Sequence, residues 1–220
     1  MKNSILSATF SCAILLNAAA TFAGGQWTEV PGGAAPHSSY LNGVAGVSAN
    51  DVWAVGGWGG GNGLIEHWDG TNWSVVAIQA EGSFLSAVAA RSADDVWVVG
   101  SYLSTQTSTE HWNGQRWAVV PSPNVGAYNT LYSVCVVSHN DAWAVGGSSP
   151  NDVYILMHWD GTSWSLVNGP PANASALASV KAFATDDVWA VGGKDGTAFT
   201  ASTFTLHWDG ATWSEVPSPT

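Results

Sequence analysis

The stretch DVWAVGG at residues 51–57 is the strongest structural signal in the chain, because it recurs three more times, unchanged or with small changes. The later copies read DVWVVGS at 95–101, DAWAVGG at 141–147 and DVWAVGG at 187–193. Similarity at a regular spacing indicates an array of one supersecondary unit, so it is read before local propensity. We therefore interpret this stretch as a structural repeat and not as a functional site.

A second shared stretch completes each unit. HWDGTNW at 67–73 is followed in later units by HWNGQRW, HWDGTSW and HWDGATW. Each unit contains four short apolar runs separated by turn signals, and no helical period interrupts them. A four-stranded meander of this length predicts an all-β fold made of four β-propeller blades. The units span about residues 41–76, 85–120, 131–167 and 177–216.

The two stretches together resemble Kelch-like repeats of the galactose-oxidase-type propeller superfamily, in particular bacterial repeats of the form DVWAVG followed by HWDGTxW. The resemblance covers residues 26–217 and implies the propeller fold, but it implies little about function, since propellers host enzymes, lectins and scaffolds. QWTEV at 26–30 looks like one more fourth strand. The chain is then either a four-bladed ring with an extra strand or an arc of a larger propeller. VPSPT at the C-terminus resembles the linker VPSPN at 120–124, which leaves truncation open.

Residues 1–23 have the features of a signal peptide: Lys2 comes first, an apolar stretch runs from 5 to 20, and small residues end at Ala23. We expect cleavage after Ala23 or Ala20, which leaves residues 24–220 as a propeller domain that is secreted or periplasmic in a bacterium. A lipoprotein signal that uses Cys12 is the alternative.

Composition excludes several classes of partner. The chain has 16 acidic and 5 basic residues and a formal net charge of −11. This excess opposes nucleic-acid phosphates and anionic membrane surfaces, so neither is expected as a partner. No second apolar run of membrane-spanning length follows the signal peptide, and we expect no membrane insertion after its removal. Cys135 is the one cysteine beyond residue 23, and we interpret it as a buried structural thiol.

The recurring residues are predicted to be structural. Twelve of the 14 tryptophans fall at three places per unit and are expected to pack the blades. His67 and its three counterparts are expected to form hydrogen bonds, since equivalent strand positions in different blades do not converge on one zinc ion. Asp69 has Asn113 as a counterpart, which favours a turn over acid chemistry. The Asn-Asp turn at Asp51 is also read as a turn, with calcium left open. No cofactor, metal site or catalytic residue is predicted.

Two enzyme families related by the resemblance fit poorly. The DGTNW turn looks like a shortened sialidase Asp-box, yet Arg91 and Arg116 are the only arginines, whereas sialidases hold a carboxylate with three. Galactose oxidase joins a cysteine to a tyrosine beside copper, and Cys135 has no matching tyrosine and histidine constellation. Neither activity is therefore expected.

The variable loops are expected to share one end of the blades, opposite the short Asn-Asp and Asp-Gly turns. Exposed aromatic residues among Ser, Thr, Asn and Gly suit sugar stacking or protein contact. The candidate ligand contacts on this variable-loop face are Trp58, Tyr102, Tyr128 and Tyr154.

Three functions follow from these observations. The first is a secreted, non-enzymatic binding module that recognises a glycan or a protein through the variable-loop face. The second is a glycan-processing enzyme, a hydrolase or lyase, with Asp152 and Asp195 as its loop carboxylates. The third is a structural envelope or assembly module, which would self-associate if the ring is open.

Overall fold

The computed structural model describes residues 29–33, 38–59, 61–150, 153–170, 174–194 and 202–218. The chain divides into two units, residues 1–30 and 31–220, and the fold described below is that of the second. The expected signal peptide lies outside the described residues, as do the first three residues of QWTEV, and Glu29 and Val30 are not in a strand. Among the described residues, no helix has the length and hydropathy needed to cross a membrane.

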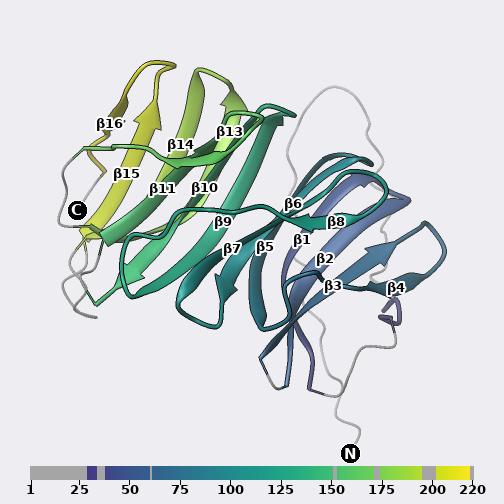
Figure 1. Cartoon of the computed structure of the whole chain (residues 1–220). Helices are drawn as coiled ribbons and strands as arrows, with labels where there is room; N and C mark the ends of the chain where they lie inside the picture. The colour runs from purple at the N-terminus through teal and green to yellow at the C-terminus, as the bar shows by residue number, and fades with distance from the viewer. Residues whose placement is uncertain are drawn as a thin grey trace, which may run out of the picture. The chain divides into compact units, whose positions relative to one another are not determined.

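The described residues contain sixteen strands in four antiparallel meanders, which confirms the prediction of an all-β propeller fold (Figure 1). Within each blade the strands pair in chain order. One backbone pair, Gly147 with Ala176, also links blades 3 and 4. Blade 1 contains β1 (Tyr40–Ser48), β2 (Asp51–Trp58), β3 (Asn62–Trp68) and β4 (Trp73–Val76). Blade 2 contains β5 (Ser83–Ser92), β6 (Asp95–Tyr102), β7 (Gln106–Trp112) and β8 (Trp117–Val119). Blade 3 contains β9 (Tyr128–Ser138), β10 (Asp141–Ser149), β11 (Val153–Trp159) and β12 (Trp164–Leu166). Blade 4 contains β13 (Ala174–Ala184), β14 (Asp187–Lys194), β15 (Ser202–Trp208) and β16 (Trp213–Glu215).

The Asp-Gly turns between the third and fourth strands are held by the aspartate side chain. Asp69 Oδ1 accepts the backbone N–H groups of Thr71 and Asn72, each at 2.8 Å. These two donors stabilise the ionised carboxylate and lower the pKa of Asp69. Gly70 has φ +93°, a left-handed conformation that glycine adopts without steric cost. Asn113 makes the same turn in blade 2, where its Oδ1 accepts two backbone N–H groups.

The first glycine of each Gly-Gly or Gly-Ser pair gives the inner strand room to bulge. All four inner strands, β1, β5, β9 and β13, have a register irregularity beside this position. A β-carbon on the glycine would overlap a carbonyl oxygen of the neighbouring inner strand in all four blades. A side chain at Gly56, Gly100, Gly146 or Gly192 would therefore force the inner strand to move.

Tryptophans make up the interfaces between consecutive blades. The ring of Trp53 in blade 1 lies 5.4 Å from that of Trp112 and 5.3 Å, edge to face, from that of Trp117, both in blade 2. Blades 2 and 3 repeat this contact, as do blades 3 and 4. Buried aliphatic side chains, joined by Met157, Cys135 and Phe204 in the later blades, fill the rest of the interfaces. The core is thus three similar layers, each between two blades.

The described blades form an open arc. The inner strands pack in sequence, β1 on β5, β5 on β9 and β9 on β13, but β1 and β13 have no comparable contact among the described strands. Of the two arrangements that the sequence allows, a closed four-bladed ring and an arc of a larger propeller, the structure agrees with the arc.

Candidate functional site

The recurring aspartates and histidines are partners of one another. His67 Nε2 lies 2.9 Å from Asp51 Oδ1, and the three other blades show the same pair at the same distance. The imidazole of His67 also stacks on the ring of Trp53, with 4.1 Å between centroids. Each pair joins the start of the second strand to the third strand within one blade. The histidines therefore take part in hydrogen bonds, as the sequence predicts.

Blade 2 elaborates this pair. Asp95 is 1% exposed and accepts a hydrogen bond from Arg91 Nε at 2.8 Å, in addition to its contact with His111. His139 Nδ1 lies 3.8 Å from the second carboxylate oxygen. Burial opposes ionisation of Asp95, but the hydrogen bonds from His111 and Arg91 outweigh it and lower its pKa. Asp95, His111 and His139 have the donor types of a metal site, yet the guanidinium of Arg91 already supplies a positive charge to the carboxylate.

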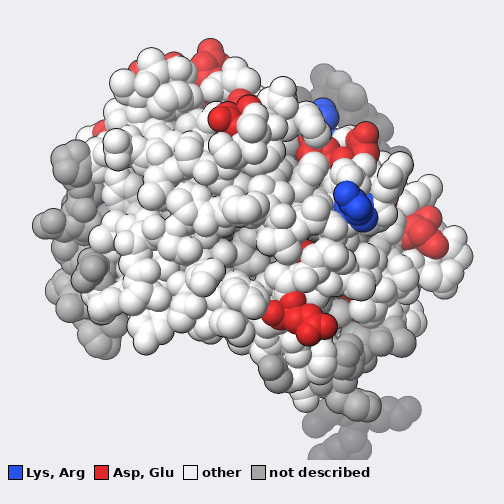
Figure 2. All heavy atoms as spheres, viewed as in Figure 1, with Lys and Arg blue, Asp and Glu red and all other residues white. Residues whose placement is uncertain are grey.

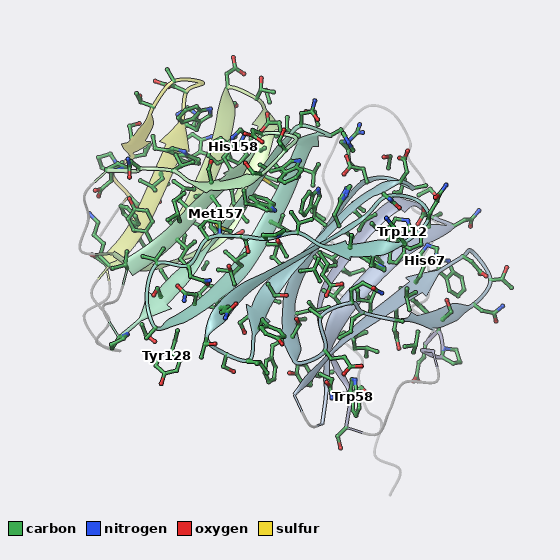
Figure 3. All side chains as sticks on the ribbon, viewed as in Figure 1. Trp58, His67, Trp112, Tyr128, Met157 and His158 are labelled. Carbon is green, nitrogen blue, oxygen red and sulfur yellow. The ribbon has the colours of Figure 1, made fainter. Side chains whose placement is uncertain are left out.

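The variable-loop face carries the aromatic residues that the sequence singles out. Trp58 pairs with Asn62, Tyr102 pairs with Gln106, and Tyr128 pairs with Ser149 at the ends of their strands. These positions lie where the second strand of a blade ends and its first and third strands begin. Figure 3 shows Trp58 and Tyr128 at the lower edge of the ribbon, away from His67 and His158.

Two adjoining grooves bring Trp58 and Tyr102 onto one surface. Trp58 lines a groove of about 460 Å³ with Asn62 and Glu81. Tyr102 lines a second groove of about 700 Å³ with Gln106 and Glu81. Ile78 and Glu81 line both grooves, so the linker between blades 1 and 2 forms their common wall. We call the two together the blade 1–2 groove.

The larger part of the blade 1–2 groove has a polar wall that is held in place by hydrogen bonds. Thr107 Oγ1 lies 2.8 Å from Ser122 Oγ, and its backbone N–H donates to Asn124 Oδ1 at 2.8 Å. Ser108 Oγ lies 3.0 Å from Ser83 Oγ in the interior. These contacts bind β7 to the linker between blades 2 and 3 and to the first residue of β5, which gives the hydroxyl-bearing wall a defined position.

A buried glutamate holds the linker that forms the common wall. Glu110 accepts the backbone N–H groups of Gln79 at 3.0 Å and Ala80 at 3.3 Å. Burial raises its pKa above the ordinary value, although the two hydrogen bonds oppose that rise. Glu110 is not among the residues that the sequence singles out. Its signal is a difference between repeats, because Glu66 and Glu110 occupy a position that is Met157 and Leu206 in the later blades.

The other sequence-predicted contacts do not join this groove. Tyr128 is 55% exposed on β9 in blade 3. Tyr154 is half-buried, its hydroxyl donates to Pro170 O at 2.8 Å, and its ring packs on Phe204 at 5.7 Å. Asp152 and Asp195, the carboxylates of the enzyme hypothesis, lie outside the described residues. Cys135 is buried, and its desolvation raises its pKa to about 12.

Comparison with known proteins relates the chain by fold and not by sequence. No protein-family model matches it, and no curated protein does. Several solved structures do match the chain. The SapL1 lectin in complex with alpha methyl fucoside is 14% identical to it, with a TM-score of 0.59. The match covers 81% of this chain and 62% of the lectin. The six-bladed fucose-recognising lectin of Aleuria aurantia matches with 13% identity and a TM-score of 0.59 over 82% of this chain and 62% of the lectin.

A protein that is not named as a lectin has a similar fold as well. YCF48 from Cyanidioschyzon merolae matches with 19% identity and a TM-score of 0.56 over 84% of this chain and 58% of YCF48. The chain spans less than two thirds of the length of each of these three proteins. At such low identity the likeness establishes the fold alone: the chain is a β-propeller protein, and the Kelch-like resemblance stays a prediction.

Proposed function

We propose that this chain is a non-enzymatic binding module that recognises a neutral glycan in the blade 1–2 groove. The observation that carries the proposal is the pairing of Trp58 and Tyr102 in adjoining grooves with a shared wall at Ile78 and Glu81. An aromatic ring offers a flat apolar surface to the C–H face of a sugar. The amides, hydroxyls and carboxylate beside the rings supply the few directed polar contacts that fix a ligand's orientation.

Charge favours a neutral sugar over an acidic one. The chain has a formal net charge of −11, and Glu81 lies on the wall shared by both grooves. A sialic or uronic acid would meet repulsion there, and no lysine or arginine is among the described residues that line the grooves. Figure 2 shows one face of the chain, on which most atoms belong to neither acidic nor basic residues.

The lining supports binding over hydrolysis. Glycoside hydrolases generally use two carboxyl groups about 5–9.5 Å apart, one of which donates a proton. Glu81 is the one carboxylate among the described residues of the two grooves. Glu110 lies beneath the linker and is engaged by the N–H groups of Gln79 and Ala80.

Binding of a panel of neutral oligosaccharides, measured by calorimetry, tests this proposal. We expect Trp58→Ala and Tyr102→Ala each to weaken binding of the best sugar at least about tenfold, since buried aromatic anchors dominate such contacts. Tyr128→Ala is the matched control, because it removes an exposed aromatic residue from the same face of another blade. Loss of binding in Tyr128→Ala alone would move the site to blade 3. Binding of peptides but no sugar would refute the glycan assignment.

The proposal includes export, which places the groove outside the cytoplasm. Its support is the sequence of residues 1–23. The mass of the protein recovered from the bacterial envelope or medium tests it, and we expect removal of 20 or 23 residues. A full-length protein found in the cytoplasm would refute this part of the proposal and leave the groove unaffected.

A further inference from the structure

The two ends of the arc expose side chains that are buried at every interior interface. In blade 1, Leu41 is 52% and Val44 is 69% exposed. In blades 2, 3 and 4 the leucine that corresponds to Leu41 is at most 1% exposed, and the valine that corresponds to Val44 is at most 9% exposed. In blade 4, Val191 is 43% exposed, whereas its three counterparts are fully buried. Each end therefore resembles one half of an interior interface without its partner.

The aromatic parts of both ends already have the interior geometry. Trp68 and Trp73 of blade 1 lie 5.8 Å apart at an interplanar angle of 47°. Trp112 and Trp117, which receive Trp53 of the preceding blade, have the same distance and angle. At the other end, Trp189 lies 4.3 Å from His207, close to the 4.1 Å between Trp53 and His67. The rings at both ends thus lie against their own blade much as the interior rings do, although Trp189 also donates its indole N–H to Asp187 Oδ1 at 2.9 Å.

The segment that enters blade 1 behaves like a linker from a preceding blade. Glu66 accepts the backbone N–H of Gly33, as Glu110 accepts those of the linker from blade 1. This segment lies beside Glu66 and Val75 and leaves Leu41 and Val44 uncovered. Blade 1 thus has the outer part of a blade interface in place and lacks the inner part.

We propose that a second copy of this chain fills the gap, with its blade-4 face (Trp189 and Val191) packed on the blade-1 face (Leu41, Val44, Trp68 and Trp73). The occupant is another copy because the two faces are equivalent to the two sides of the interfaces inside this chain. The contact is head to tail, so each copy retains one unused face unless the assembly closes into a ring. This proposal does not rest on the proposed sugar binding.

Light scattering of the purified protein over a range of concentrations tests the proposal. We expect a mass of at least two chains for the native protein and of one chain for Val44→Asp and for Val191→Asp. Both positions are exposed in the single chain, so circular dichroism should show both variants folded. The control is Leu166→Glu, which places a charge on the outer strand of blade 3 at a residue that is 47% exposed. The equivalent position of blade 4 is already a glutamate, Glu215. This control should assemble like the native protein.

Mixing the two variants tests the head-to-tail direction. The intact blade-4 face of Val44→Asp meets the intact blade-1 face of Val191→Asp, so the mixture should regain a mass of two chains. A contact between two blade-1 faces would instead be lost in Val44→Asp and kept in Val191→Asp, which would overturn the proposal. A native protein with the mass of one chain at all concentrations, or assembly unaffected by either variant, would also overturn it.

Discussion

Gly192 and Gly193 are neighbours in β14 and provide a test of why the repeat requires glycine. A β-carbon at Gly192 would overlap the carbonyl oxygen of Ala176 and lie 2.9 Å from Leu177 Cα. At Gly193 the nearest atom, Ser202 O, is 3.9 Å away. The difference arises because β13 has an irregular register between Leu177 and Ser179 and comes close to β14 there.

The expected effects have opposite signs. Overpacking costs about 1–3 kcal/mol, and a weakened ladder hydrogen bond adds about 1 kcal/mol. Alanine has less conformational freedom than glycine in the unfolded chain, which stabilises the folded state of both variants by about 0.4–1 kcal/mol. We therefore expect Gly192→Ala to lower the free energy of unfolding by about 2–3 kcal/mol and Gly193→Ala to raise it by about 0.5 kcal/mol.

Urea denaturation followed by tryptophan fluorescence measures both values. The corresponding gap in Tm is about 5–14 °C for a chain of this length. If the two variants had the same stability within about 0.5 kcal/mol, close approach of the inner strand would not be the reason for the glycine.

Two further predictions concern titratable groups. The pKa of Asp95 is lower in the folded protein than its ordinary value of 3.8, so its pairing stabilises the fold above about pH 4 and this contribution is lost as the pH falls through the lowered pKa. The difference in free energy of unfolding between the native protein and Asp95→Asn should accordingly shrink between pH 6 and pH 2.5, and a difference independent of pH would contradict the pairing. Cys135 has a pKa of about 12, so at pH 8 its thiolate population should be about a thousandfold below that of a thiol at the ordinary value of 9.0. A disulfide reagent should therefore label Cys135 slowly in the native protein and rapidly in guanidinium; fast native labelling would contradict its burial.

The repeat makes most of the blade predictable from sequence. Asp69 and Gly70 predict a tight turn, and the recurrence of Trp53 predicts a packed strand. Both can be recognised because each depends on only a few neighbouring residues. The aspartate–histidine pair is less visible, since Asp51 and His67 are 16 residues apart and meet only when the second and third strands pair. The recurrence of both in every unit is the signal that would have joined them.

The blade 1–2 groove was harder to foresee. It depends on Ile78 and Glu81, which lie in a linker that the repeats do not share, and on Glu110, at a position where only the first two repeats have glutamate. The sequence selected Trp58 and Tyr102 from their loop positions, but four separate loops offered no reason to pair these two. Their two grooves adjoin because blade 1 packs on blade 2, a tertiary contact that no local pattern encodes.

The position of the groove links binding to the stability of blade 1. In a repeat array each unit is stabilised chiefly by its neighbours, so a terminal blade with one covered face is the easiest to open. Blade 1 is covered by blade 2, and the linker that joins them carries Ile78 and Glu81 of the groove. A sugar that contacts Trp58 on one blade and Tyr102 on the next binds only while the two are packed, and it therefore stabilises that interface. A second copy on Leu41 and Val44 would stabilise the same blade from its other side. Binding and assembly thus act on one blade through different faces, so Trp58→Ala and Val44→Asp should separate them.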